Sequence, residues 1–152
     1  MDATIRQMRD EDRDQLVEMA RALIQETPYR GQIVGEESQL HVLFDLVTRR
    51  GAVWVAEVEG RVVGMIGALT VVIPVVNRRV GTEVAWWVDP KVRGTGPGLA
   101  LLQVAEEWAR AEGAVAMQIA VHDNVGLEQV CRRRGYRPQE VVYEKELEQW
   151  PG

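Results

Sequence analysis

The chain has 152 residues, of which 46% are hydrophobic and 27% charged, so we expect residues 1–152 to form a single globular domain with a continuous core. A net charge of -5 argues against the broad positive surface that unspecific nucleic-acid binding requires. One cysteine excludes an internal disulfide, and every apolar run is too short to span a membrane. We therefore expect a soluble, cytoplasmic protein that has neither a nucleic-acid nor a membrane partner.

The first half of the chain predicts a strand, two helices and a hairpin. Residues 3–8 resemble a short strand, and the apolar spacing after an acidic turn at 10–12 predicts an amphipathic helix that ends before Pro28. Residues 27–35 are typical of a loop, and helical spacing then returns until Gly51. Two β-branched runs, 52–58 and 61–72, predict an antiparallel hairpin, after which residues 77–79 form a polar break.

The second half alternates strands and helices. A strand at 82–89 leads into the glycine-rich turn RGTGPG, and a helix at 99–112, a strand at 115–121, a helix at 124–134 and a final strand near 141–145 follow. Within the first of these helices, Glu106 and Arg110 are expected to form an outward pair. A strand–helix–strand order implies a crossover between parallel strands. The prediction is an α/β (α+β) fold, with a mixed, mostly antiparallel sheet flanked by helices and one parallel βαβ crossover at the glycine turn.

The glycine-rich turn carries the clearest chemical signal. Pro97 suits the first turn of a helix, so the glycines lie where a strand turns into a helix. The unpaired N–H groups and the positive end of such a helix can bind a phosphate or pyrophosphate, and Gly94, Gly96 and Gly98 let the backbone approach it closely. Arg93 can add a charge-assisted bond to phosphate. The alternative is a tight structural turn with solvated basic neighbours.

Two other phosphate-binding patterns fit worse. The Walker pattern needs Lys and Ser or Thr after its last glycine, whereas Leu99 and Ala100 follow Gly98. A dinucleotide fingerprint would require glycine at position 99 and would normally open its domain. The turn therefore matches no nucleotide-binding pattern cleanly.

The segment VDPKVRGTGPGLALL, residues 88–102, resembles the coenzyme-binding motif of the GNAT superfamily of N-acyltransferases. Its signature is Gln or Arg, two residues, Gly, one residue, then Gly or Ala, which Arg93, Gly96 and Gly98 match. The resemblance extends over the order of elements from about residue 5 to residue 145. It implies a GNAT-like fold, acetyl-CoA as co-substrate, and N-acetyltransferase activity by direct attack of a primary amine in a ternary complex.

The resemblance also implies which residues hold the coenzyme. The amides from Arg93 to Gly98 would hold the pyrophosphate, and the backbone near Trp87 and Val88 would pair with the pantetheine arm and stabilise the developing oxyanion. In the family this strand carries a bulge and diverges from its parallel neighbour, which opens a slot for the thioester. The complete set of implied coenzyme-binding residues is Trp87, Val88, Arg93, Gly94, Thr95, Gly96, Pro97, Gly98 and Asn124.

Attack on a thioester requires a neutral amine, but an alkyl ammonium with a pKa of about 10.4 is mostly protonated at neutral pH, so a base is needed. Glu83 matches the position of the glutamate base in several family members, and its alternative role is a solvated carboxylate at a strand start. His122 follows an apolar run and is the second candidate, with a turn or capping histidine as the alternative. Asp123 or Asn124 is expected to cap the following helix.

The general acid is less defined. Many family members use a tyrosine four residues before the glycine of a Gly-aromatic pair, and the pair Gly135-Tyr136 places Cys131 at that position. Tyr136 and Tyr143 could replace that tyrosine as the general acid, and the alternative for each is a core or surface aromatic role. This departure keeps a second function open, a non-catalytic acyl-CoA-binding or regulatory module. A third reading is an interaction module whose glycine turn is only structural.

The acceptor is expected between the early loop and the sheet, where Tyr29, Arg30, Glu36 and Glu37 lie. It would be a small-molecule or peptide amine, and a homodimer is left open. His41 has no acidic or cysteine cluster with metal-ligand spacing around it in the sequence, so we expect no metal.

Overall fold

The computed structural model describes residues 2–30, 37–122 and 124–148, and its strands form one sheet in the order β1-β2-β3-β4-β5. Neighbouring strands from β1 to β4 are antiparallel, whereas β4 and β5 are parallel. The predicted mixed, mostly antiparallel sheet is therefore confirmed. The strands are β1 (Thr4–Gln7), β2 (Gly51–Val58), β3 (Arg61–Ile73), β4 (Arg78–Val88) and β5 (Met117–Gln118).

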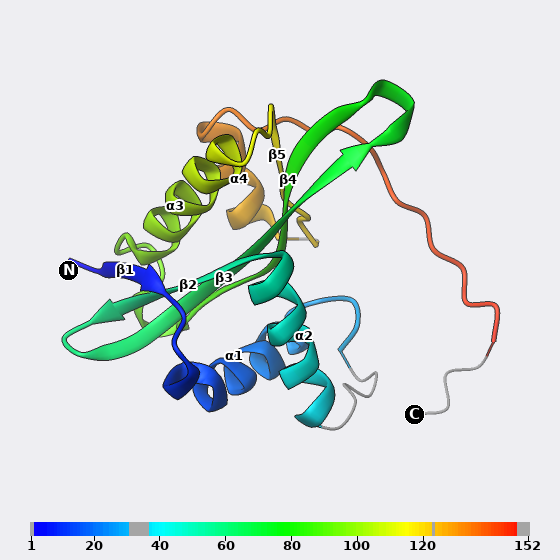
Figure 1. Ribbon diagram of the computed structural model, residues 1–152. Coiled ribbons are helices and arrows are strands. Elements are labelled where there is room, and N and C mark those ends of the chain that lie inside the picture. Colours follow the sequence, from blue (N-terminus) through cyan, green and yellow to red (C-terminus); the bar gives the residue numbers. More distant parts are fainter. Residues whose placement is uncertain (1, 31–36, 123, 149–152) are drawn as a thin grey trace.

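Helices cover both faces of this sheet (Figure 1). On one face, α1 (Arg13–Gln25) and α2 (Glu37–Arg50) bury apolar side chains such as Leu16 and Phe44 against β2 and β3. On the other face, α3 (Pro97–Ala111) buries Leu101 and Leu102, and α4 (Val125–Arg133) follows β5. The chain thus crosses from β4 through α3 to the parallel strand β5, as predicted. Within the described residues, no helix combines the length and the apolar character that crossing a membrane would require.

Two strand predictions need adjustment near the parallel pair. The predicted polar break at 77–79 lies partly inside β4, which begins at Arg78 and continues the pairing with β3 from a short 3-10 turn, η2 (Pro74–Val76). The predicted strand at 115–121 is too long, because only Met117 and Gln118 pair with β4. Pairing along this edge therefore stops at Thr82 and Gln118, and the rest of β4 has no described strand partner on that side.

The predicted final strand near residues 141–145 is wrong. Residues 137–148, which we call the C-terminal segment, form neither helix nor strand and run away from the helices and the sheet (Figure 1). Val141, Val142 and Tyr143 are 74%, 82% and 92% exposed. Their composition favours a strand, but a strand forms only where a sheet edge pairs with it.

Candidate active site

A bulge interrupts β4 in the middle of its pairing with β3. Gly67 pairs with Ala85 and Ala68 pairs with Glu83, so Val84 is an extra residue on β4. Val84 and Ala85 consequently both line the α1–α2 side of the sheet, whereas Trp86 packs on the α3 side. The bulge that the family resemblance implies is therefore present.

The parallel pairing of β4 with β5 ends just before this bulge. Its last pair is Thr82 with Gln118, and from Glu83 to Val88 no described strand pairs with β4 on its β5 side. We call the diverging strand ends the fork, with one arm at 83–88 and the other at 119–122. Apart from the Val88 carbonyl, which accepts from Arg93 Nε, the backbone groups of the first arm that face the second are thus open to an extended ligand.

Glu83 lies at the base of the fork and is half-buried. Burial raises the pKa of its carboxyl from 4.5 to about 7, and a hydrogen bond from the backbone of Ala120 partly opposes this rise. Ala120 is two residues before His122, so the two candidate bases belong to the two arms of one fork. A carboxyl whose pKa is near neutrality can both accept and release a proton under physiological conditions.

The second arm also meets the loop after α1. The rings of Tyr29 and His122 pack edge to face, with their centroids 6.0 Å apart. A candidate acceptor residue and a candidate base are thus brought together from distant segments of the chain. Arg30 is exposed beside Tyr29, and Glu36 lies outside the described residues.

Glu37 lies close to one polar side chain of α1 and one of α2. It begins α2 and is exposed, and its carboxylate lies with Asp14 and His41 in a group whose ligand atoms are all within 4.8 Å of one another. The sequence spacing around His41 did not predict this group, because Asp14 comes from α1. Exposed acidic groups of this kind are common without an ion, so the group alone assigns no metal.

The glycine turn follows η3 (Pro90–Val92) and presents open backbone. Gly94 and Gly96 have φ angles of +82° and +119°, a region that side chains rarely adopt, and a Cβ at either position would meet no atom within 4 Å. No side chain caps α3 at Gly96, so the amides of the first helical turn have no partner within the helix. The amides of Arg93 and Thr95 already donate to the carbonyls of Pro90 and Val92, and Pro97 has no N–H, so the amides of Gly94, Gly96 and Gly98 are the ones left for a phosphate group. Thr95 closes the turn from inside, because its Oγ1 donates to the carbonyl of Val92 at 2.6 Å.

Arg93 is bound by protein groups rather than directed into this open space. Its Nε donates to the carbonyl of Val88 at 2.7 Å, and its two terminal nitrogens donate to the Glu26 carboxylate at 2.7 and 2.8 Å. Trp87 Nε1 donates to the same carboxylate at 2.6 Å, and the guanidinium centre lies 5.7 Å from the Trp87 ring. The hydrogen bonds from Arg93, and to a lesser extent that from Trp87, lower the pKa of Glu26 against the effect of burial. We call Glu26, Trp87 and Arg93 the Glu26 cluster.

Sequence reasoning did not identify Glu26. The one signal it offered was an acidic residue at the C-terminal end of a predicted helix, where the helix dipole disfavours negative charge. Its partners are 61 and 67 residues further along the chain, a separation at which residue spacing carries no information.

The last helix supplies two further candidate residues. Asn124 is its N-cap, because Asn124 Oδ1 accepts from the backbone N–H of Leu127 at 3.0 Å, which confirms the capping prediction. Cys131 is buried, and burial together with the charges of Glu83 and Glu128 raises the pKa of its thiol. The thiol therefore stays protonated and uncharged at neutral pH.

The two tyrosines considered as stand-in acids have other surroundings. The hydroxyl of Tyr136 donates to Glu106 at 2.7 Å, and Arg134 binds the other oxygen of that carboxylate at 2.8 Å. Burial and the bond to Glu106 raise the pKa of Tyr136, which makes it a poorer acid than a free tyrosine. Tyr143 lies on the exposed C-terminal segment. Glu106 thus joins α3 to the end of α4, which replaces the pair with Arg110 that the sequence predicted.

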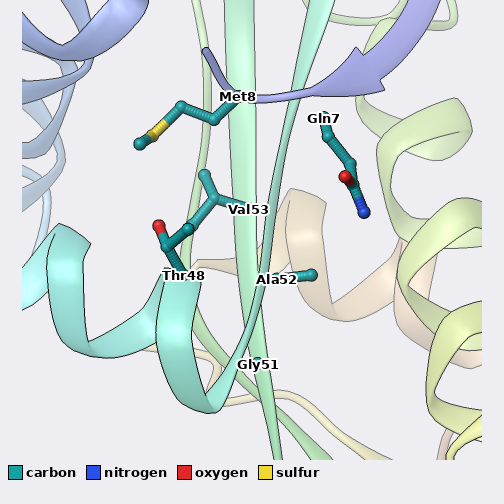
Figure 2. Close-up of a pocket in the computed structure, with 6 residues that line it drawn as sticks. All are labelled: Gln7, Met8, Thr48, Gly51, Ala52 and Val53. Carbon is teal, nitrogen blue, oxygen red and sulfur yellow. The ribbon is translucent and has the colours of Figure 1, made fainter. Parts of the chain in front are cut away.

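A pocket elsewhere in the molecule lacks chemical groups of this kind. It lies near the start of β2, which is two strands away from β4 in the sheet, and Figure 2 shows the residues that line it. None of its lining side chains is ionisable, so we place no reaction there. They are Gln7, Met8, Thr48, Gly51, Ala52 and Val53.

Comparison with known proteins gives a family match and several structures of similar fold. Residues 16–136 match the family model described as acetyltransferase (GNAT) family. A putative acetyl transferase from Pyrococcus furiosus is 25% identical with a TM-score of 0.74, and the match covers 96% of this chain and 100% of that one. A search of curated proteins finds no match.

Two more distant structures share the fold. Glucosamine-6-phosphate N-acetyltransferase from Arabidopsis thaliana is 15% identical with a TM-score of 0.75, over 97% of this chain and 100% of that one. AAC(6')-Iy, in complex with the bisubstrate analogue CoA-S-monomethyl-acetylneamine, is 16% identical with a TM-score of 0.76, over 96% and 99% of the two chains.

Proposed function

Because the chain belongs to the acetyltransferase (GNAT) family, whose members use acetyl-CoA as co-substrate, we propose that it transfers the acetyl group of acetyl-CoA to a primary amine. The observation that carries the proposal is the open, uncapped backbone of the glycine turn beside the fork between β4 and β5. The turn supplies donors for a pyrophosphate, and the fork supplies a strand edge and a titratable carboxylate.

In this proposal the coenzyme lies along the first arm of the fork. The backbone amides between Arg93 and Gly98 bind the pyrophosphate, and the open edge of β4 near Trp87 and Val88 pairs with the pantetheine arm. A backbone N–H at that edge stabilises the negative charge that develops on the thioester oxygen. Arg93 orients the turn through Val88 and Glu26, and Asn124 contributes from the start of α4.

Glu83 acts as the general base in the proposed reaction. The amine nitrogen attacks the thioester carbonyl carbon in a ternary complex, its proton passes to the Glu83 carboxylate directly or through water, and the carbon–sulfur bond breaks. The pKa of about 7 places Glu83 close to the optimum for a base at neutral pH. His122 is the second candidate base, and its contact with Tyr29 favours a role in holding the acceptor loop.

The leaving group needs little help. A thiol resembling cysteine has a pKa of about 8.5, so coenzyme A can depart as a thiolate without a dedicated acid. This property is compatible with a buried, protonated Cys131 at the position where many relatives have tyrosine.

The proposed acceptor is a small-molecule or peptide amine that enters beside the loop after α1. Tyr29, Arg30 and Glu37 border this region, and Glu36 belongs to the same loop in the sequence. The names of two structural neighbours support the small-molecule class, since one acts on glucosamine-6-phosphate and the other was solved with an acetylneamine derivative.

Calorimetry with acetyl-CoA, followed by turnover assays on amino sugars, polyamines, amino acids and peptide N-termini, tests this function. We expect a saturable coenzyme site and release of CoA with at least one amine class. Absence of coenzyme binding would refute the proposal. Tight binding without turnover on the whole panel would instead favour the non-catalytic acyl-CoA-binding module.

We also propose that the chain forms a homodimer by reciprocal exchange of the C-terminal segment. The segment exposes Val141, Val142, Tyr143 and Leu147, and β5 is the last strand of the sheet, with an open edge. Charge is complementary as well, because the segment carries four glutamates against Arg137 and Lys145, a net charge of -2, and the start of β4 exposes Arg78 and Arg79. In a two-fold dimer each segment would extend the partner's sheet.

Light scattering should give a mass of twice 17.1 kDa for the wild type. The double variant Val141→Lys/Tyr143→Lys should shift towards 17.1 kDa, since lysine at both positions removes the apolar contact, whereas Gln139→Lys adds charge outside the apolar run and should stay dimeric. A monomeric wild type at micromolar concentration would contradict the proposal.

A further inference from the structure

Glu26 stands at a place where an acidic residue needs a compensating partner. It follows directly after α1 as the C-cap residue, and no basic residue lies in the last turn of that helix. The negative end of the helix dipole repels a carboxylate there. The charge is compensated by Arg93 of the glycine turn, which follows the end of β4 in the chain.

One carboxylate thereby joins three parts of the proposed site. It accepts from the indole N–H of Trp87, at the end of the open arm of β4, and from both terminal nitrogens of Arg93, in the glycine turn. The Nε of Arg93 returns to the carbonyl of Val88, so the guanidinium has protein partners for all three of its nitrogens. A bidentate pair with such additional bonds has a defined geometry, unlike an ordinary surface ion pair.

The third part is the loop that borders the acceptor region. It begins one residue after Glu26, and Thr27 stabilises it by accepting from the backbone N–H of Tyr29 at 3.2 Å and of Arg30 at 3.1 Å. The Tyr29 ring then reaches His122 on the second arm of the fork. Residues 27–30, the described start of this loop, are therefore held between the Glu26 cluster and this aromatic contact.

We propose that Glu26 is a positioning residue of the acetyl transfer, which fixes the glycine turn, the open arm of β4 and the acceptor loop relative to one another. The inference rests on the proposed function and adds a role for a residue that touches neither reacting atom. In this proposal Arg93 keeps its hydrogen bonds to Glu26 and to the carbonyl of Val88 when coenzyme is bound. The pyrophosphate is then held by backbone amides and not by the guanidinium.

The competing arrangement makes the opposite prediction for one variant. If coenzyme phosphate displaces Glu26 from Arg93, then Glu26→Gln removes a competitor and should tighten acetyl-CoA binding. If Glu26 positions the turn, the same variant should weaken it. Glutamine keeps the size of the side chain but replaces one acceptor oxygen by an amide that cannot accept from Arg93.

The experiment compares Glu26→Gln, Trp87→Phe and the control Glu18→Gln by acetyl-CoA calorimetry, steady-state kinetics and thermal unfolding. Glu18 is a matched control, because it lies on α1 and pairs with Arg21 on the surface. For Glu26→Gln we expect kcat/KM for both substrates to fall about tenfold, less than the roughly hundredfold loss that a 1 Å displacement of reacting groups can cause. The unfolding midpoint should change by only a few degrees, because an exposed ion pair contributes little to stability.

Trp87→Phe, which keeps an aromatic ring but loses the indole N–H and the second ring, should reproduce the coenzyme part of this loss more weakly. Unchanged kinetics in Glu26→Gln with an active wild type would overturn the inference, and so would tighter coenzyme binding. Failure of the wild type to bind acetyl-CoA would refute the proposed function itself, so the two failures are distinguishable.

Discussion

Replacing Gly96 by valine is expected to weaken acetyl-CoA binding by roughly a hundredfold, or about 2.7 kcal/mol, while the chain still folds. At a φ of +119°, Gly96 has a conformation that a β-branched residue adopts only with strain. The added atoms would meet no protein atom within 4 Å of the Cβ, so they would project into the open space where the pyrophosphate is proposed to lie. The loss should therefore appear in ligand affinity more than in packing.

A matched control separates backbone strain from loss of the ligand site. Gly60, in the turn between β2 and β3, also has a positive φ, +78°, and open space around its Cβ. Gly60→Val should thus lower the unfolding midpoint to a similar extent and leave the calorimetric affinity for acetyl-CoA unchanged. Equal affinity in Gly96→Val and wild type would show that the glycine turn is only structural.

Replacing Glu83 by glutamine is expected to lower kcat by about 10² to 10⁴, the usual contribution of a general base, with little change in coenzyme affinity. In the wild type the rate should rise with pH through about 7, because the carboxyl must lose its proton before it can accept one from the amine. Glutamine cannot titrate, so this inflection should be absent from the pH–rate profile of the variant.

The exposed Glu107 on α3 provides the control, as Glu107→Gln should keep both the rate and the inflection. If Glu83→Gln retains the wild-type profile, the base is His122 or bulk solvent, and His122→Gln distinguishes these two.

The Glu83→Gln variant should also change the free energy of unfolding. The folded pKa of Glu83, about 7, lies above the ordinary glutamate value of 4.5, so between these two pH values the folded state holds the proton that the unfolded state has largely lost. Stability contributed by the protonated form is therefore lost as pH rises from about 4.5 through about 7. Urea unfolding should find Glu83→Gln more stable than wild type at pH 8, on the order of 1 to 2 kcal/mol for a half-buried group, with a smaller difference near pH 5.

The order of the elements could be predicted because it follows from local patterns. Helical spacing located α1 to α4, and glycine and proline located the turn before α3, since both signals lie within a few residues of the structure they specify. The bulge at Val84 was expected only from the family resemblance. Its local signal is weak, because TEVAWWV satisfies a regular strand as well as a bulged one.

Interactions between distant segments could not be predicted in the same way. Arg93 was assigned to phosphate because its sequence neighbours are glycines, whereas in the structure its partners are Glu26 and the carbonyl of Val88. Helical spacing pairs Glu106 with Arg110, but in the structure its partners are Arg134 and Tyr136, which follow the end of α4. The C-terminal segment has the composition of a strand, and composition does not specify which edge it pairs with.

The extra residue in β4 has a consequence for comparing this chain with its relatives. In a regular strand Glu83 and Trp87 would lie on the same face of the sheet. In this structure the charge of Glu83 raises the pKa of Cys131 in α4, whereas Trp87 donates to Glu26 after α1 on the other face. The extra residue Val84 causes this difference, because it shifts the alternation of side chains by one position. A relative with the same residues but one deletion in this strand would carry its carboxylate on the opposite face. The number of residues between that carboxylate and the arginine of the glycine turn, rather than identity at either position, is thus the feature to compare when relatives are sorted into catalysts and binding modules.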